Sequence, residues 1–312
     1  MKIVFLDAKS IGEDMDLSEF DTLGEVVKYD ASTESETAQR VCDADVIILN
    51  KVKINEQSIA TARNLKLVCV TATGTDNLDK EYLEQRGIAW RNVAGYSTET
   101  VAQHTFAMLF YLYEKLNYYD HYVKSECYVN DKQFTHFDNH FHEISGKTWS
   151  IIGLGNIGRR VADIAKAFGC HVIYYSTSGR NSQAGYERVE FEELLAKSDI
   201  ISIHAPLDER TRGLMNQEAF CQMKSSAVLL NLGRGPIVSE ADLAEALTKG
   251  TIAAAGLDVL SAEPMTSDNP LRTIKDSERL LITPHIAWAS VEARTRLMHI
   301  IAEQIREFCG SK

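Results

Sequence analysis

Residues 149–175 read WSIIGLGNIGRRVADIAKAFGCHVIYY, and this stretch decides the fold. The apolar run Trp149–Ile152 enters glycines spaced as G-x-G-x-x-G, an amphipathic segment follows, and Val172–Tyr175 is apolar again. A strand, a tight turn, a helix and a second strand in this order form a βαβ unit, which is the context that makes the glycine pattern informative. The stretch therefore predicts a parallel sheet with a ligand site at the glycine turn.

Each glycine has its own task in this turn. Gly153 permits the sharp bend, Gly155 lets a pyrophosphate approach the backbone, and Gly158 lets the helix pack closely on the strand. The phosphates would rest on the free N–H groups and the positive end of the helix, which opens with Asn156 and Ile157. A dinucleotide cofactor is favoured over a glycine-rich turn without a ligand, because a strand and a helix flank the glycines as the motif requires.

Outside this unit, the same alternation of apolar runs with helix-compatible stretches continues. It predicts parallel sheets with crossover helices. The predicted strands are 2–7, 26–29, 46–49, 67–71, 88–91, 149–152, 172–175, 200–204, 228–231, 253–258 and 280–282. The predicted helices are a long one from Thr98 to about residue 116 and further ones at 157–168, 191–197, 239–248 and 291–308.

Length and charge limit the function. The chain has 312 residues and a formal net charge of −11. Roughly 150 residues per domain predicts two domains, and the acidic balance argues against nucleic-acid or membrane partners, since polyanion binding needs a basic surface. No apolar run approaches the ~20 residues of a membrane span, and Asp7 comes too early for a signal peptide. The six cysteines have no paired spacing, so we expect reduced thiols in a cytoplasmic protein.

The type of dinucleotide depends on residues after the second strand of the βαβ unit. An NAD site usually places Asp or Glu there, about 20 residues past the glycines, to bind the ribose hydroxyls. This chain has no carboxylate before Glu187 and offers instead Ser176, Thr177, Ser178 and Arg180. Hydroxyls and a guanidinium suit a 2′-phosphate, so we expect an NAD(P) cofactor, with NADPH preferred over NADH. The alternative is that Arg180 is a solvated loop charge.

Three charged side chains follow predicted strands in the last third of the chain: Arg234 in NLGRGP, Glu263 in GLDVLSAEP and His285 in TPHIAW. Open α/β sheets bind ligands beyond the carboxyl ends of their strands, so the three could converge. A guanidinium can hold a substrate carboxylate and polarise a carbonyl. A histidine can protonate the alkoxide that hydride addition builds, and a carboxylate bonded to the imidazole would orient it and raise its pKa. These residues are our candidates for catalysis on a 2-oxo acid.

Together these motifs resemble the D-isomer-specific 2-hydroxyacid dehydrogenases over nearly the whole chain. The resemblance rests on GLGNIG, on SDIISIHAP with a threonine five residues beyond the proline, on NLGRG, DVLSAEP and TPHIA, and on VTATGTDNLD at 70–79. It implies an α/β protein of two domains, with a Rossmann-type cofactor domain at 98–287 inserted into a flavodoxin-like substrate domain of residues 1–97 plus 288–312. The helix and arm at about 98–145 usually build a homodimer.

The resemblance also implies further contacts with ligands. Beyond the glycine turn and the hydroxyl loop, cofactor contacts would come from Thr100, His204, Ala205, Pro206, Thr211, Leu232, Gly233 and Asp258. Substrate contacts would come from Lys51 and from backbone N–H groups near Thr73 and Gly74, in addition to Arg234 and His285.

Sequence variants within these motifs indicate which branch of the family the chain resembles most. Val101-Ala102-Gln103-His104 replaces the Val-Ala-Glu of many members, and VAQHTFA and TPHIAWAS look most like glycerate dehydrogenases or hydroxypyruvate reductases. This predicts hydroxypyruvate or glyoxylate as substrate. D-lactate-type and other D-2-hydroxyacid dehydrogenases remain alternatives; formate dehydrogenases are disfavoured because they pair the histidine with glutamine. A remote alternative is a nucleotide-sensing co-repressor, which would not need the three catalytic candidates.

An aromatic and histidine-rich stretch precedes Gly146. His136, His140 and His142, with His121 and Glu143 nearby, invite a metal interpretation because imidazole is the commonest metal ligand. Their spacing follows no recognised ligand pattern, and phenylalanines lie between them. We therefore expect a packed arm, at a dimer interface or in a loop, and no metal.

Overall fold

The computed structural model describes residues 1–180 and 185–310, and in it the chain forms two compact units. Met1–Ser97 and Ala289–Lys312 make the first unit, and Thr98–Trp288 makes the second. The second unit is thus an insertion in the first. It extends to Trp288, next to the expected boundary at 287, and the Trp288 indole N–H donates to the carbonyl oxygen of His285 at 2.9 Å.

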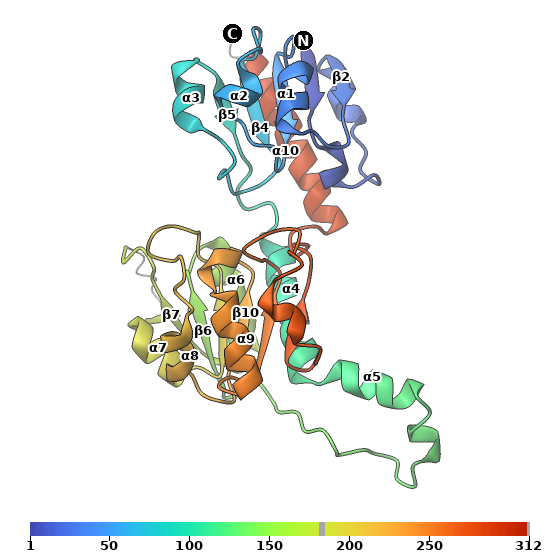
Figure 1. Ribbon diagram of the computed structural model, residues 1–312, viewed down its shortest axis with the longest axis vertical. Helices are drawn as coiled ribbons and strands as arrows, with labels where there is room; N and C mark the ends of the chain where they lie inside the picture. Colours follow the sequence, from blue (N-terminus) through green and yellow to red (C-terminus); the bar gives the residue numbers. More distant parts are fainter. Residues whose placement is uncertain (181–184, 311–312) are drawn as a thin grey trace. The chain divides into compact units, whose positions relative to one another are not determined.

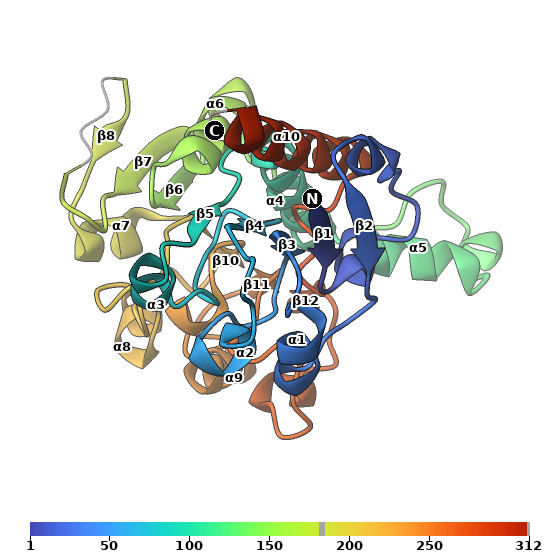
Figure 2. The same cartoon turned by 90° about the horizontal axis from the view of Figure 1, so that it is seen from above.

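The first unit is built on a five-stranded parallel sheet (Figure 1 and Figure 2). Its order, β2-β1-β3-β4-β5, is the doubly wound order of flavodoxin-like folds. The strands are β1 (Lys2–Phe5), β2 (Glu25–Lys28), β3 (Val46–Leu49), β4 (Leu67–Val70) and β5 (Ala89–Arg91). The helices are α1 (Glu34–Arg40), α2 (Glu56–Ile59), α3 (Lys80–Gln85) and α10 (Val291–Gly310).

The second unit has a seven-stranded parallel sheet in the order β12-β11-β10-β9-β6-β7-β8. The strands are β6 (Thr148–Ile152), β7 (His171–Tyr175), β8 (Glu187–Arg188), β9 (Ile200–Ile203), β10 (Val228–Asn231), β11 (Ala254–Leu257) and β12 (Leu280–Ile282). The helices are α4 (Thr98–Tyr113), α5 (Leu116–Lys124), α6 (Asn156–Ala167), α7 (Phe191–Lys197), α8 (Gln217–Gln222) and α9 (Glu240–Lys249). The strand order reverses between β6 and β9, which is where doubly wound sheets bind ligands.

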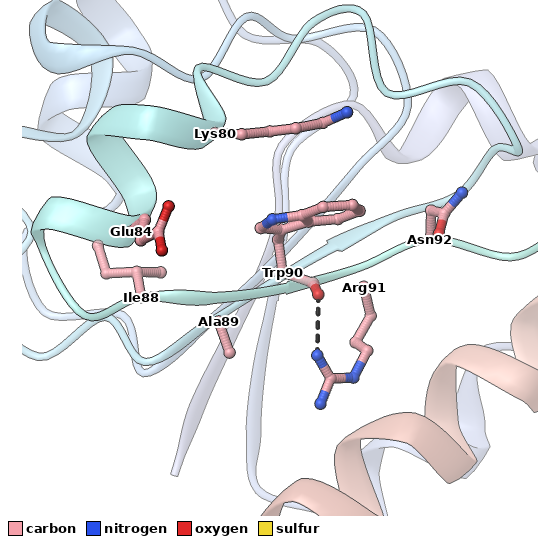
Figure 3. Close-up of a pocket in the computed structure, with 7 residues that line it drawn as sticks. All are labelled: Lys80, Glu84, Ile88, Ala89, Trp90, Arg91 and Asn92. Carbon is pink, nitrogen blue, oxygen red and sulfur yellow. Dashed lines mark hydrogen bonds between the residues drawn. The ribbon is translucent and has the colours of Figure 1, made fainter.

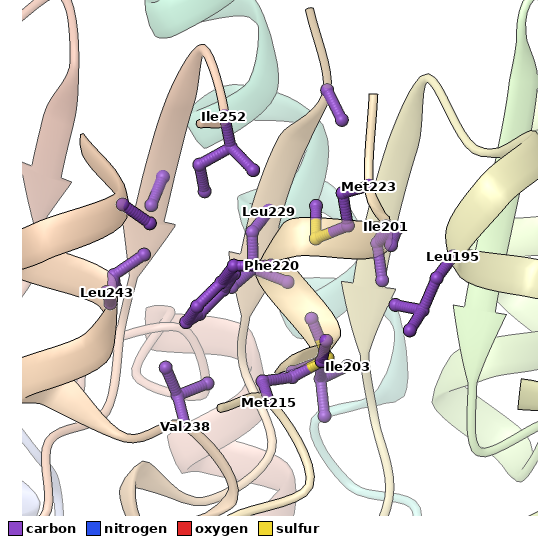
Figure 4. Packing of buried hydrophobic residues seen from close by; sticks show 14 of the residues in the cluster. Leu195, Ile201, Ile203, Met215, Phe220, Met223, Leu229, Val238, Leu243 and Ile252 are labelled. Atoms are coloured by element: carbon purple, nitrogen blue, oxygen red, sulfur yellow. The ribbon is translucent and has the colours of Figure 1, made fainter. Parts of the chain in front are cut away.

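Both faces of this sheet are covered by packed side chains, so its central strands are buried along their whole length. Every residue of β9 and β10 is buried. Leu195 of α7, Phe220 of α8 and Leu243 of α9 pack with Leu229 of β10 into one hydrophobic cluster (Figure 4). Burying one such side chain contributes about 1.5–3 kcal/mol. The cluster therefore fixes the strands, and with them the polar residues that follow their carboxyl ends.

The predicted fold class is confirmed: the chain has two parallel α/β sheets, one of them Rossmann-type. All eleven predicted strands are present, with ends within two residues of those expected. The short β8 and α8 have no counterpart in the prediction, because such short segments show no measurable periodicity. The long helix breaks earlier than expected, since Lys115 adopts a left-handed conformation (φ 56°) between α4 and α5.

An arm follows α4 and consists of α5, a short 3-10 helix (Tyr128–Asn130) and a chain without regular structure that reaches β6. His136 stacks on Tyr122 with ring centroids 3.8 Å apart, and its Nε2 lies 2.6 Å from the Tyr118 hydroxyl. Large apolar side chains of the arm are nevertheless exposed, namely Leu116, Val123, Tyr128, Val129, Phe134, Phe137 and Phe141. In the described part of the chain, no helix combines the length and apolarity needed to cross a membrane.

Candidate active site

The catalytic candidates lie at one edge of the second sheet. Arg234 follows β10, Asp258 follows β11 and His285 follows β12, and these three strands are parallel neighbours. Parallel neighbours place their carboxyl ends at the same edge, so the sheet collects these segments there.

Glu263 and His285 form a hydrogen-bonded pair. The Nδ1 of His285 lies 2.7 Å from Oε2 of Glu263, and the side chains are 26 and 32 % exposed. The other Glu263 oxygen accepts the backbone N–H of Leu260 at 2.9 Å, which fixes the carboxylate plane. An ionised carboxylate can only accept, so Nδ1 carries a proton and Nε2 is the imidazole nitrogen left for chemistry.

The turn that carries Arg234 is held from both sides. The Asn231 side chain accepts from the N–H of Gly233 at 3.1 Å and donates to the Arg234 carbonyl oxygen at 3.0 Å. A Cβ on Gly235 would lie 1.9 Å from the carbonyl carbon of Leu260, so only glycine lets this turn meet the loop that leads to Glu263. The Arg234 guanidinium donates to the carbonyl oxygen of Gly233 at 2.9 Å.

Asp258 organises the loop that carries His285. Its buried carboxylate accepts the N–H groups of Ile286 and Ala287 at 2.9 and 3.0 Å and the hydroxyl of Thr283 at 2.6 Å. Its carbonyl oxygen accepts the N–H of His285 at 2.8 Å. His285 has φ 55°, a left-handed conformation that costs a non-glycine residue free energy and that surrounding bonds must impose.

The glycine turn is built as its sequence requires. Gly153 has φ 92°, and a Cβ there would lie 2.7 Å from the backbone of Ala205. A Cβ on Gly158 would lie 2.4 Å from the carbonyl oxygen of Gly153, whereas one on Gly155 would meet nothing within 4 Å. The helix α6 begins after Gly155 without a side-chain cap and without an acidic residue in its first turn, which includes Asn156. Open space before uncapped N–H groups suits an anionic group.

His204 and its neighbours adjoin this turn. A Cβ on Gly233 would lie 2.9 Å from the Ala205 carbonyl oxygen, so the turns after β6, β9 and β10 meet at Ala205. Both ring nitrogens of His204 are buried, and neither has a hydrogen-bond partner among the described residues. Burial lowers the pKa of His204 to about 3, so its ring is neutral. Such an orphaned polar group is expensive, and a bound ligand would satisfy it.

Other predicted cofactor residues have different surroundings. Thr211 is fully buried, and its hydroxyl donates to the Pro206 carbonyl oxygen at 2.8 Å, so it braces this loop from inside. Leu232 is buried beside Gly233, and Thr100 lies in the first turn of α4.

The hydroxyl loop after β7 is a compact turn. Ser176 is buried, and its carbonyl oxygen accepts from Gly179 at 3.0 Å. Thr177 and Ser178 are half-buried, and Arg180 is exposed.

The first unit brings its predicted substrate loops together. Asp7, buried after β1, accepts the N–H groups of Asn50 and Lys51 at 2.9 and 2.8 Å. Asn77 donates its side-chain amide to the Val52 carbonyl oxygen at 2.8 Å and thereby joins the loop after β3 to the loop after β4, which holds Gly74. In that second loop the Thr73 hydroxyl donates to the carbonyl oxygen of Val93 at 2.9 Å.

Sequence reasoning missed Asp7 and Thr283 as site organisers. Both have a signal that could have found them, because a polar side chain near the carboxyl end of a buried parallel strand lies at the edge of the sheet where ligands bind.

Two other features lie outside these groups. Within the described residues, one cluster has metal-ligand composition: Glu19, His299 and Glu303. Arg306 donates to both carboxylates, so a cation is already present in the cluster. An open hollow at the edge strand β5 contains none of the predicted site residues (Figure 3); it is lined by Lys80, Glu84, Ile88, Ala89, Trp90, Arg91 and Asn92.

Residues 106–287 match the family described as D-isomer specific 2-hydroxyacid dehydrogenase, NAD binding domain. The chain belongs to this family. It is therefore an oxidoreductase that acts on CH–OH groups with a nicotinamide cofactor, and the resemblance deduced from its motifs is confirmed.

Named relatives of this dehydrogenase cover almost its whole length. The hydroxypyruvate reductase of Blautia hydrogenotrophica is 36 % identical, over 99 % of this chain and 97 % of the relative. The glycerate dehydrogenase of Methylorubrum extorquens is 35 % identical, over 100 % of this chain and 97 % of the relative. Among solved structures, an acyclic imino acid reductase in complex with NADPH and D-Arg is 30 % identical, with a TM-score of 0.88 over 100 % of this chain and 98 % of that chain.

Proposed function

We propose that this dehydrogenase reduces hydroxypyruvate to D-glycerate and also accepts glyoxylate. The observation that carries the proposal is the 2.7 Å contact between His285 and Glu263 at the ligand edge of the second sheet. The names of the relatives support the substrate, since both concern the interconversion of hydroxypyruvate and glycerate.

The roles of the three residues follow from their chemistry. When bound, the nicotinamide supplies the hydride to the substrate carbonyl carbon. Arg234 holds the substrate carboxylate and polarises the carbonyl. His285 gives the proton on Nε2 to the developing alkoxide, and Glu263 keeps Nδ1 protonated and the ring oriented. In the oxidising direction the same nitrogen takes the hydroxyl proton.

The second unit would hold the cofactor. Gly153, Gly155, Asn156, Ile157 and Gly158 would bind the pyrophosphate, and the fit rests on the open space at Gly155 and on the uncapped start of α6. The orphaned nitrogens of His204 supply a second, independent indication of a ligand beside this turn. The loop segments 204–206 and 232–233 would line the groove. Thr100 and Asp258 are further candidates for contact with the cofactor, and Thr211 supports the loop from inside.

The first unit would supply substrate contacts. We assign a second contact with the substrate carboxylate to backbone N–H groups at Thr73 and Gly74, and a further substrate contact to the Lys51 side chain. Asp7 and Asn77, which fix these two loops, would act as their supports.

The reaction is tested by oxidation of NADPH and NADH with hydroxypyruvate, glyoxylate, pyruvate and 2-oxoisocaproate. We expect the highest kcat/KM with hydroxypyruvate and D-glycerate as the product. A preference for pyruvate would move the protein to the D-lactate-type alternative, and no turnover with any of the four would favour the nucleotide-sensing alternative.

NADPH is the proposed preferred cofactor. Ser176, Thr177, Ser178 and Arg180 offer hydroxyls and a guanidinium where an NAD site usually has a carboxylate. We expect a higher kcat/KM with NADPH, and we expect Arg180→Ala to raise the KM for NADPH alone. A marked preference of the wild type for NADH would contradict the assignment.

We further propose a homodimer formed through the arm, and a cytoplasmic location. Phe134 and Phe137 are 90 and 68 % exposed, and monomers rarely leave such aromatic patches uncovered. All six cysteines lie in the described ranges and are free thiols, as a reducing compartment favours. Sedimentation should show a dimer that the Phe134→Ser/Phe137→Ser variant weakens, while Val291→Ser, at an exposed apolar residue outside the arm, serves as the control. A monomeric wild type would exclude the dimer.

A further inference from the structure

His104 reaches the catalytic loop from a different element. It lies in α4, next to Gln103. Its Nε2 is 3.1 Å from the hydroxyl oxygen of Thr283 and 3.7 Å from Oδ1 of Asp258. The first distance is a hydrogen bond and the second is too long for one, so His104 acts on Asp258 through Thr283.

The positions of the protons give this chain of hydrogen bonds a direction from donor to acceptor. The Thr283 hydroxyl has one proton, and it donates that proton to Asp258 at 2.6 Å. Its oxygen can then only accept from His104, so Nε2 of His104 carries a proton. The resulting order is imidazole N–H to hydroxyl to carboxylate. Each bond polarises the next, and the donors together stabilise the buried negative charge.

The carboxylate at the end of this chain holds the segment that contains His285. Asp258 accepts from the N–H groups of Ile286 and Ala287, directly after the left-handed residue His285. If the Thr283 hydroxyl lost its orientation, Oδ1 would lose its shortest donor, and the loop would be free to relax away from the strained conformation.

We propose that His104 is a positioning residue for catalysis, which fixes His285 through Thr283 and Asp258. The inference rests on the proposed function for the role of His285, but the bonding chain itself does not depend on the substrate. The His104 side chain is 21 % exposed, and its hydrogen bond goes to Thr283.

The test compares two substitutions of His104. Leucine removes the N–H donor, whereas glutamine places an amide N–H close to the position of the imidazole Nε2. We expect His104→Leu to lower kcat by about 3- to 30-fold, the range of network couplings, with the substrate KM within about twofold, because only the reacting loop is disturbed. His104→Gln should restore most of the kcat. Gln103→Leu, one residue away and exposed, is the matched control and should leave the kcat unchanged.

A readout that needs no turnover separates this inference from the proposed function. Amide hydrogen exchange of the peptide covering residues 283–288 should be faster in His104→Leu and Thr283→Val than in the wild type, and the double variant should add little to either, since both break one chain of bonds. Exchange in α6 should not change. If the wild type were inactive but the variants still showed faster exchange at residues 283–288, only the proposed function would be contradicted. The role of His104 would be overturned if His104→Leu left both the amide exchange and the kcat unchanged. It would also be overturned if His104→Gln lowered the kcat as much as His104→Leu does.

Discussion

Asp7 in the first unit and Asp258 in the second occupy corresponding places in their sheets. Each follows a parallel strand, and each is buried, with 8 and 2 % of its surface exposed. Each carboxylate accepts N–H groups of the loop after a neighbouring strand, at Asn50–Lys51 after β3 and at Ile286–Ala287 after β12. The same anchor is thus present in both units.

The two anchoring aspartates differ in the loop that each holds and in the kinds of hydrogen-bond donor that each accepts. Asp7 accepts backbone N–H groups, and burial raises the pKa of its carboxyl. Asp258 also accepts the Thr283 hydroxyl, and its loop holds His285 in a left-handed conformation. The aspartate that holds the strained loop thus accepts a side-chain donor in addition to backbone N–H groups. We propose that this difference separates a binding loop, at Asn50–Lys51, from a reacting loop, which holds His285.

The largest expected effect comes from the group that the second anchor positions. His285→Ala removes the proposed acid and should lower kcat by about 10²- to 10⁴-fold, the usual contribution of a general acid. Binding of NADPH, followed by fluorescence, should change little. His171→Ala, at an exposed histidine of β7, serves as the control. A near-normal kcat in His285→Ala would remove the reacting role of this loop.

Substitutions of the two anchoring aspartates should affect different kinetic constants: kcat for Asp258 and the KM of the 2-oxo acid for Asp7. Asp258→Asn leaves a backbone N–H of the reacting loop without its acceptor, which should lower kcat by about 10- to 100-fold. Asp7→Asn disturbs the loop at Lys51 in the same way, and it should raise the KM for the 2-oxo acid by a similar factor while kcat stays within about threefold. Steady-state kinetics of both variants decide. Equal losses of kcat in both would show that the loops do not differ in role.

A related effect should appear in the kcat of Glu263→Gln. The amide can turn its NH2 group toward Nδ1 of His285, which leaves the ring N–H without its acceptor, so kcat should fall by about 10- to 100-fold. An unchanged kcat would mean that Glu263 does not orient His285. Asp7→Asn is the comparison variant, and its kcat should stay within about threefold.

The smallest effect concerns stability. The pKa of His204 is lowered to about 3 by burial, against an ordinary value of about 6.5. Between these two pH values His204 binds a proton in the unfolded chain but not in the folded one. The free energy of unfolding is therefore highest above pH 6.5 and decreases as the pH is lowered below that value. By pH 5 the loss should be about 2 kcal/mol.

Urea unfolding at pH 7 and pH 5 measures this loss. His204→Gln, which cannot take up the proton, should lose less stability on acidification than the wild type. His171→Gln, at an exposed position, should lose as much as the wild type. Identical losses in all three proteins would show that the His204 ring is accessible to protons.

The amino-acid sequence was enough to predict the architecture and the family. Continuous apolar runs predict the parallel strands because both faces of such a sheet are buried, and the spacing of Gly153, Gly155 and Gly158 predicts the turn because the backbone geometry there admits no side chain or needs open space. Arg234, Glu263 and His285 could be selected because each follows such a strand and has a residue type that the reaction requires.

Tertiary structure alone decided the contacts between segments that lie far apart in sequence. Nothing in the pattern around His104 indicates that it meets Thr283, and nothing around Asp7 or Asp258 shows which N–H groups they accept. Periodicity reports burial along one element, whereas these bonds depend on which elements become neighbours and in which register. The left-handed conformation of His285 belongs to the same class, because its cost is met by bonds from other strands and not by local sequence.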